Sequence, residues 1–246
     1  MAVRARHSRP RAQHFLRSSK LAAELVRAAG VGRGDLVYDL GAGTGVLTRA
    51  IAAAGADVVA VELDQGLADH LRTRFPDVIT GDATQVPLPR TPFRVVANLP
   101  FVQTTAILRR LLDPRIPLAS ADVIVQWGFA EKRAAVWPST QLGVEWSAWY
   151  ELTIGRRLAR CAFAPPPPVD AAVLHANRRE MPLVDPRDAG NYHRFLQRGF
   201  QDGLRAVASR HELKRAGVEE GFDPQARPRD LDARQWAGLY AVRSRR

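Results

Sequence analysis

The chain has 246 residues, 46% of them hydrophobic, which is enough for one large domain with a buried core and a small second one. No apolar run is long enough to span a bilayer and no secretory signal is evident, so we expect a cytoplasmic protein without a membrane partner. The single cysteine, Cys161, excludes internal disulfides and zinc sites built from several cysteines, and the scattered histidines predict no metal site.

The net charge of +11 is concentrated at the two ends of the chain. Residues 1–20 carry six basic and no acidic side chains, residues 178–246 carry a surplus of five positive charges, and the segment between is balanced. Of the 36 basic residues 33 are arginine, whose planar side chain can bridge phosphates and stack on bases. The pattern favours a polyanion such as RNA, although a basic protein with a disordered tail would also show it. The candidate RNA contacts near the N-terminus are Arg4, Arg6, Arg9, Arg11 and Arg17.

Strands and helices alternate over the first half of the chain. A capped helix is predicted over 18–30, and further helices over 47–55, 67–71 and 104–112. The predicted strands between them are 36–40, 57–63, 78–80, 93–98 and 122–127. This alternation is typical of an α/β fold whose parallel sheet is covered by helices on both faces.

The pattern changes after residue 149. Two strands over 150–163 and 169–177, joined by a run of four prolines, are predicted to form an antiparallel pair at the edge of the sheet. Cys161 falls in the first of them and is expected to be a small buried apolar residue. Polar helices follow at about 188–208, 210–217 and 230–241. We therefore expect a basic N-terminal segment (1–20), an α/β domain (21–178) and a helical domain (179–246).

A glycine-rich loop follows the first strand of the sheet. It reads Asp39-Leu-Gly41-Ala-Gly43-Thr-Gly45, and such glycines let a backbone approach a ligand at the start of a helix. The third glycine comes two residues after the second, whereas a dinucleotide fingerprint would place it at position 46. The loop resembles motif I of class I methyltransferases that use S-adenosyl-L-methionine (AdoMet), although the loop alone leaves a nucleotide-binding or dehydrogenase function open.

Three polar groups follow at the ends of later strands. Glu62 can accept hydrogen bonds from ribose hydroxyls, and Asp82 from an adenine amine. Asn98-Leu-Pro-Phe101 ends the fourth strand and combines an amide, a restricted backbone carbonyl and an aromatic ring. Those groups suit the exocyclic amine of a flat base, although an ordinary strand end with a turn proline would read similarly.

These elements, in this order, resemble the rRNA adenine N6-methyltransferase family, which includes Erm-type 23S rRNA methyltransferases and KsgA-type dimethylases. Gln13-His14-Phe15-Leu16 resembles the family's N-terminal Gln-Asn-Phe-Leu, with His14 in place of the asparagine. The segment from Phe163 to Asp170 resembles its Phe-x-Pro-x-Pro-x-Val motif. The resemblance implies a class I AdoMet-dependent fold, that is, a Rossmann-like, mostly parallel seven-stranded sheet with a small C-terminal helical domain.

The resemblance also implies roles for individual residues. The implied AdoMet contacts are His14, Leu16, Gly41, Gly43, Glu62, Asp82, Ala83 and Asn98. The implied catalytic segment is Asn98, Leu99, Pro100 and Phe101, with Phe163 closing over the target base. Asn98 and the Leu99 carbonyl would accept from the N6 amine of a flipped adenine while Phe101 stacks on its ring, with no strong base needed.

The implied substrate is one adenine of 23S rRNA, either naked or in a ribosomal precursor, and its methylation would block macrolide, lincosamide and streptogramin B binding. We expect a monomeric enzyme. A KsgA-type enzyme acting on small-subunit rRNA and a non-catalytic RNA-binding assembly or transcription factor remain open, whereas Leu99 disfavours a DNA adenine methyltransferase. Core packing and RNA stacking explain four tryptophans equally well: Trp127, Trp137, Trp146 and Trp149.

Overall fold

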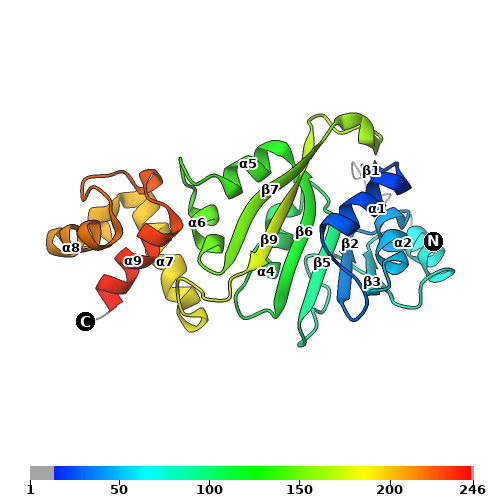
Figure 1. Cartoon of the computed structure of the whole chain (residues 1–246), viewed down its shortest axis with the longest axis horizontal. Coiled ribbons are helices and arrows are strands. Elements are labelled where there is room, and N and C mark those ends of the chain that lie inside the picture. The colour runs from blue at the N-terminus through cyan, green and yellow to red at the C-terminus, as the bar shows by residue number, and fades with distance from the viewer. Residues whose placement is uncertain (1–13, 245–246) are drawn as a thin grey trace, which may run out of the picture.

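A seven-stranded sheet runs through the centre of the structure, a computed structural model that describes residues 14–244 (Figure 1). Its strand order is β4-β3-β2-β5-β6-β9-β7. Neighbouring strands from β4 to β6 run parallel, and β9 lies antiparallel between β6 and β7. The strands are β2 (Leu36–Leu40), β3 (Asp57–Glu62), β4 (Val78–Thr80), β5 (Phe93–Asn98), β6 (Leu118–Gln126), β7 (Tyr150–Leu158) and β9 (Ala171–Arg178). The predicted α/β fold with a mostly parallel sheet is confirmed.

Helices cover both faces of this sheet. One face packs against α1 (Ser19–Ala28), α2 (Val46–Ala53) and α3 (Gln65–Arg72), and the other against α4 (Thr104–Leu111), α5 (Trp127–Ala134) and α6 (Gln141–Ser147). Successive strand residues alternate between the two cores: Val96 belongs to the first and Val95 and Ala97 to the second. Because both faces are buried, the strands read as continuous apolar runs, which is why they could be recognised in the sequence.

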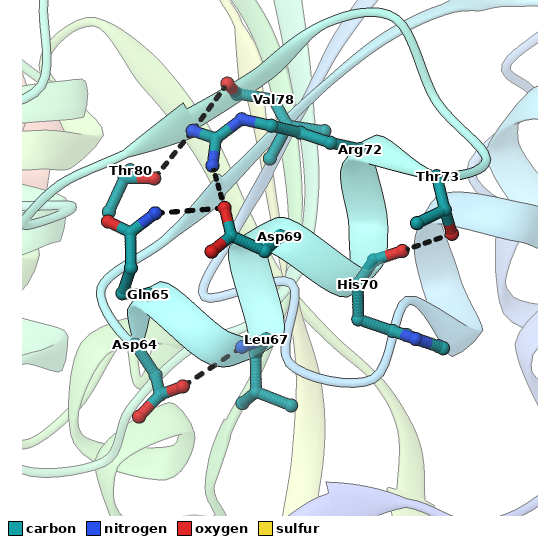
Figure 2. A network of polar contacts seen from close by, with 9 residues as sticks. All are labelled: Asp64, Gln65, Leu67, Asp69, His70, Arg72, Thr73, Val78 and Thr80. Carbon is teal, nitrogen blue, oxygen red and sulfur yellow. Dashed lines mark hydrogen bonds and ion pairs between the residues drawn. The ribbon is translucent and has the colours of Figure 1, made fainter.

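A polar network attaches α3 to the outer strand β4, and Figure 2 shows it. The Asp64 carboxylate accepts from the Leu67 amide at 2.9 Å and so begins the helix. At the other end, Arg72 donates to Asp69 at 2.7 Å and to the Thr80 hydroxyl at 2.6 Å. The loops that follow β3 and β4 are thereby held at the same edge of the sheet.

The segment after β6 differs from the prediction. Helices α5 and α6 were not predicted, and α5 begins at Trp127, which was predicted to end a strand. Strand β6 begins four residues earlier than predicted. Strand β7 ends at Leu158, and a 3₁₀ turn, η1 (Arg160–Ala162), leads into the short strand β8 (Phe163–Ala164). Strand β8 pairs with β1 (Phe15–Leu16) in a separate two-stranded sheet. The expectation that Cys161 is buried is wrong, because it lies in the turn and its side chain is exposed.

Three helices follow β9 and lie at one end of the molecule, beyond α6 and β7 (Figure 1). They are α7 (Ala189–Asp202), α8 (Arg210–Glu220) and α9 (Ala233–Ser244), accompanied by the 3₁₀ turns η2 (Pro186–Asp188), η3 (Leu204–Ala206) and η4 (Pro228–Asp230). Helix α7 ends before the predicted residue 208 because Gly203 takes a φ of +86°. Within residues 14–244, no helix is sufficiently long and apolar to cross a membrane.

The four tryptophans divide between the core and the surface. Trp146 and Trp149 are buried, and Trp149 packs edge-on against Tyr192 of α7 with ring centroids 5.9 Å apart. Trp137 is 60% exposed, and its indole donates to the Asp230 carbonyl in η4 at 3.0 Å. Trp127 is partly buried at the start of α5. Core packing thus accounts for two of the four.

Candidate active site

A cavity of about 300 Å³ opens where β2, β3, β4 and β5 end at their carboxyl termini. Parallel α/β sheets commonly bind their ligands at this edge. The sequence-predicted residues that line it are His14, Gly41, Glu62, Ala83, Asn98, Leu99, Pro100 and Phe101. Phe15 and Gly81, which stand in the recognised motifs, also line it, and the lining residues that the sequence did not single out are Val61, Leu63, Val102 and Gln103. The structure therefore brings segments more than eighty residues apart around one cavity.

Glycines let the loop after β2 approach its neighbours closely. Gly41 has a φ of +80°, and a Cβ there would lie 3.4 Å from the Pro100 ring. Gly43 has a φ of +56°, and a Cβ there would lie 2.7 Å from the Phe15 ring, closer than real contacts allow. Gly43 thus does not line the cavity itself, but its missing side chain makes room for Phe15, which does. The loop ends at Gly45, where α2 begins without a side-chain cap from Gly45, as its N-cap residue has no side chain to accept a hydrogen bond.

Glu62 is held rigidly at the end of β3. Its side chain is only 2% exposed, and its two carboxylate oxygens accept from the Gly43 amide at 2.8 Å and the Asp64 amide at 2.9 Å. Each carboxylate oxygen can accept a further hydrogen bond. The arrangement fits a pair of ribose hydroxyls, because the two oxygens are fixed and their acceptor capacity is not used up.

Asp39, at the end of β2, is a functional candidate that the sequence analysis noted only as the first residue of the glycine motif. It is buried, and its Oδ2 accepts from the Thr48 hydroxyl at 2.7 Å, whereas its Oδ1 finds no partner in the part of the chain that the structure describes. Burial raises the pKa of Asp39 to about 7; the Thr48 hydrogen bond opposes that rise and the Glu62 charge adds to it. A cationic ligand next to this carboxylate would favour its charged form.

Asp82 lies beside the cavity rather than in its wall. Its Oδ1 accepts from both the amide and the hydroxyl of Thr84 at 2.8 Å, and its Oδ2 lies 3.5 Å from the Gln103 side-chain nitrogen. Its neighbours Gly81 and Ala83 form part of the wall. Gln103 was missed in the sequence because it stands two residues beyond the recognisable motif, at the start of α4.

Asn98 combines a satisfied donor with an unsatisfied acceptor. Its Nδ2 donates to the His14 carbonyl at 2.7 Å, and its Oδ1 is buried without a hydrogen-bond partner among residues 14–244. A buried unpaired acceptor is unusual and is expected to meet a ligand donor. The His14 ring lies 5.7 Å from the Phe101 ring, and its Nδ1 is 2.9 Å from the Pro165 carbonyl. His14 therefore links three segments around this cavity.

Several of the sequence-predicted residues lie away from the cavity or outside the described residues. Phe163 pairs with Leu16 between β8 and β1; both are buried in the core, so the Phe163 ring has no face open to the cavity in this structure. Leu16 instead lines a small recess beside it, together with Asp39. Arg17 is exposed, whereas the remaining N-terminal arginines lie outside the described residues. Within the described chain, no three His, Cys, Asp or Glu side chains are grouped to hold a metal ion.

Comparison with known proteins places this geometry in a family. A family model described as ribosomal RNA adenine dimethylase matches residues 6–221. The mycinamicin-resistance protein MyrB of Micromonospora griseorubida is 35% identical, over 94% of this chain and 77% of that protein. Ribosomal RNA small subunit methyltransferase A of a Synechococcus species is 32% identical, over 92% of this chain and 89% of that protein.

The fold agrees with these sequence relatives. The crystal structure of the 23S rRNA methyltransferase ErmE matches with a TM-score of 0.80 at 26% identity, over 93% of this chain and 98% of that one. AdoMet fits the cavity described above, because Glu62, the glycine loop and the buried Asn98 oxygen offer acceptors and a close backbone approach. The chain therefore belongs to the ribosomal RNA adenine dimethylase family and is an rRNA adenine N6-methyltransferase that uses AdoMet.

Proposed function

We propose that the enzyme methylates N6 of one adenine in the peptidyl-transferase region of 23S rRNA and thereby confers resistance to macrolide, lincosamide and streptogramin B antibiotics. Two comparisons support this choice of substrate. The relative MyrB is named for mycinamicin resistance, and the structure matched with a TM-score of 0.80 is a 23S rRNA methyltransferase. We also propose that the enzyme acts as a monomer, on naked RNA or on a ribosomal precursor.

The proposed chemistry rests on the Asn98 Oδ1, which is buried and has no hydrogen-bond partner in the described part of the chain. We propose that it accepts one N–H of the target amine and that the Leu99 carbonyl accepts the other. Both bonds draw the nitrogen lone pair out of ring conjugation and point it at the incoming carbon. AdoMet, when bound, supplies that carbon as an activated methyl group on a positively charged sulfur. Once methylated, the amine loses its proton readily, so the site needs no strong base.

The target base must leave its stack in the RNA to enter this cavity. Phe101, partly buried in the wall, offers a ring on which the flipped adenine can stack. The cavity wall next to it ends in Val102, which is 94% exposed and is free to contact the RNA around the base. Phe163 is buried in the core, so its ring does not reach a base in the cavity in this conformation.

We propose that both basic ends of the chain bind the RNA backbone. Arg17 is exposed and follows the cavity-lining His14 by three residues, and the other N-terminal arginines precede it in the chain. The division into a basic segment (1–20), a methyltransferase domain (21–178) and a helical RNA-binding domain (179–246) is part of this proposal. Neutralised phosphates release counterions, so binding by these ends should weaken steeply as the salt concentration rises.

A KsgA-type activity on small-subunit rRNA is the second candidate. The Synechococcus relative named as a small-subunit methyltransferase favours it, because the match covers nine-tenths of both proteins. Primer extension on 23S and 16S rRNA from cells that express the protein separates the two. The proposal predicts a reverse-transcription stop in the peptidyl-transferase region of 23S rRNA and macrolide resistance of the cells. A stop confined to 16S rRNA would reject it in favour of the second candidate.

A further inference from the structure

We propose that a second pocket next to the active site binds the RNA nucleotide adjacent to the target adenine, through its phosphate and its base. The pocket lies where β6 ends and α5 begins, and β7 and η1 complete its wall. We call it the basic pocket and define it by Trp127, Phe129, Lys132, Arg133, Arg157 and Arg160. This inference rests on the proposed methylation of rRNA and assigns the enzyme a second RNA-binding site.

The basic pocket is a concentration of positive charge in an otherwise neutral part of the chain. Four cationic side chains line it, against the single carboxylate of Asp170. Asp170 pairs with the Arg157 guanidinium at 2.9 Å and accepts from the Arg160 backbone amide at 3.3 Å, whereas no acidic side chain within residues 14–244 pairs with the Lys132 ammonium or the Arg160 guanidinium. The Arg160 Nε donates to the Pro167 carbonyl at 2.7 Å, which orients its guanidinium. Because this hydrogen bond fixes the guanidinium in one orientation, the pocket presents a positioned donor to an anion.

Aromatic rings accompany these charges. The Arg157 guanidinium lies 4.7 Å from the centre of the Trp127 ring, and Arg133 lies 5.2 Å from that of Phe129. Cations interleaved with partly buried aromatic rings suit a nucleotide better than a free inorganic anion, because the base can stack while the phosphate is paired. The pocket volume of about 690 Å³ is within the range of small-ligand sites.

The position of the basic pocket indicates which nucleotide it takes. Asn98 of the active site pairs in register with Ile124 on the neighbouring strand, and Gln126 of the basic pocket comes two residues later. Strand geometry puts these two positions about 8 Å apart. The proline run between residues 164 and 168 contacts a residue of each site: the Pro165 carbonyl accepts from His14 of the active site, and the Pro167 carbonyl accepts from Arg160 of the basic pocket. Neighbouring nucleotides of one strand can therefore occupy both pockets.

Charge removal in the basic pocket tests the proposal. The test variant is Lys132→Gln/Arg160→Gln, and the matched control is Arg33→Gln/Arg74→Gln. The control residues are also exposed, but they lie before β2 and β4, at the opposite end of the strands. We expect the test variant to bind a 23S rRNA transcript roughly tenfold more weakly at 0.15 M salt, and the slope of log Kd against log salt to fall by about 1.4. AdoMet affinity, measured by calorimetry, should stay at the wild-type value.

A second pair of variants tests the aromatic part. Trp127→Phe keeps a stacking ring and should retain the affinity for RNA, whereas Trp127→Leu should lose affinity. Both variants should keep the wild-type melting temperature. If the Lys132/Arg160 variant behaves like the Arg33/Arg74 control, or if Trp127→Phe and Trp127→Leu bind RNA equally, the basic pocket does not bind the substrate. Wild-type protein is assayed for methylation in parallel. Absence of wild-type methylation of 23S rRNA would refute the proposed function, whereas the binding comparison would still decide the role of the pocket.

Discussion

Asn98 offers the sharpest test of the chemistry, because its two side-chain atoms do different things. The nitrogen donates a hydrogen bond from β5 to the His14 carbonyl, and the buried oxygen, which has no partner within residues 14–244, can accept from a ligand. Asn98→Ala removes both functions. Asn98→Asp removes the hydrogen bond to His14 but keeps an acceptor, because a carboxylate accepts hydrogen bonds and cannot donate to a carbonyl; it also adds a negative charge. The comparison of the two variants isolates the oxygen.

The magnitudes of the two effects are well separated. Loss of one hydrogen bond such as that to His14 costs about 1 kcal/mol of stability, which a typical domain tolerates. Removal of a preorganised hydrogen-bonding group at a reacting centre lowers kcat by roughly 100- to 1,000-fold, or about 2.7–4 kcal/mol. We therefore expect Asn98→Ala to fold and to bind AdoMet with weakened affinity while its kcat falls by that factor. Asn98→Asp should keep at least about ten times the kcat of the alanine variant.

Single-turnover methyl transfer at saturating RNA and AdoMet measures this difference without interference from binding. Circular dichroism and calorimetry on the same preparations check the fold and the cofactor affinity. If Asn98→Ala turned over at the wild-type rate, the oxygen would have no part in catalysis. If the alanine and aspartate variants lost the same activity, the hydrogen bond to His14 rather than the free acceptor would be the important interaction.

Three further predictions concern residues in and around the cavity. Phe101→Ala should lose roughly 1–3 kcal/mol of base stacking, seen as a lower kcat/KM for RNA that Phe101→Tyr does not share; equal values for the two variants would assign stacking to another ring. Gly43→Ala should weaken AdoMet binding measured by calorimetry, because its Cβ would collide with Phe15. Gly30→Ala is the control, since its φ of +64° carries the same strain with no atom within 4 Å, and equal AdoMet affinities would rule out the collision. The melting temperature of Asp39→Asn should rise relative to that of the wild type as the pH rises from about 4 to about 7. In this range the Asp39 carboxyl of the unfolded chain has lost its proton, whereas that of the folded chain loses it only near pH 7, so the wild type alone is destabilised. A pH-independent difference would mean that Asp39 titrates normally.

Much of the site was predictable because local sequence determines it. The glycine loop, Glu62 and Asn98 each stand at the end of a short apolar strand, and parallel strands place their carboxyl ends at one edge of a sheet. The alternation of strands and helices therefore predicted the fold and the edge of the sheet at which the cavity opens. Helix ends were less predictable, as at Gly203, where a positive φ ends α7 within a polar helical pattern.

Features that depend on pairing between distant segments could not be predicted. Strand β8 pairs with β1 across about 150 residues, which buries Phe163 and moves Cys161 into an exposed turn. The basic pocket has the same origin: Lys132 lies on α5 and Arg160 follows β7, and nothing in the local sequence brings them together. The net charge of residues 21–177 is zero, so the local concentration of positive charge is visible only in three dimensions.

The central claim is that a buried amide oxygen directs the amine of a 23S rRNA adenine toward the methyl group of AdoMet. The most direct measurement is nucleoside analysis of 23S and 16S transcripts after incubation with the purified protein and methyl-labelled AdoMet. We predict label in N6-methylated adenosine from the 23S transcript, and labelling that is roughly 100- to 1,000-fold slower when Asn98→Ala replaces the wild type. Label confined to the 16S transcript, or in a nucleoside other than N6-methylated adenosine, would contradict the account.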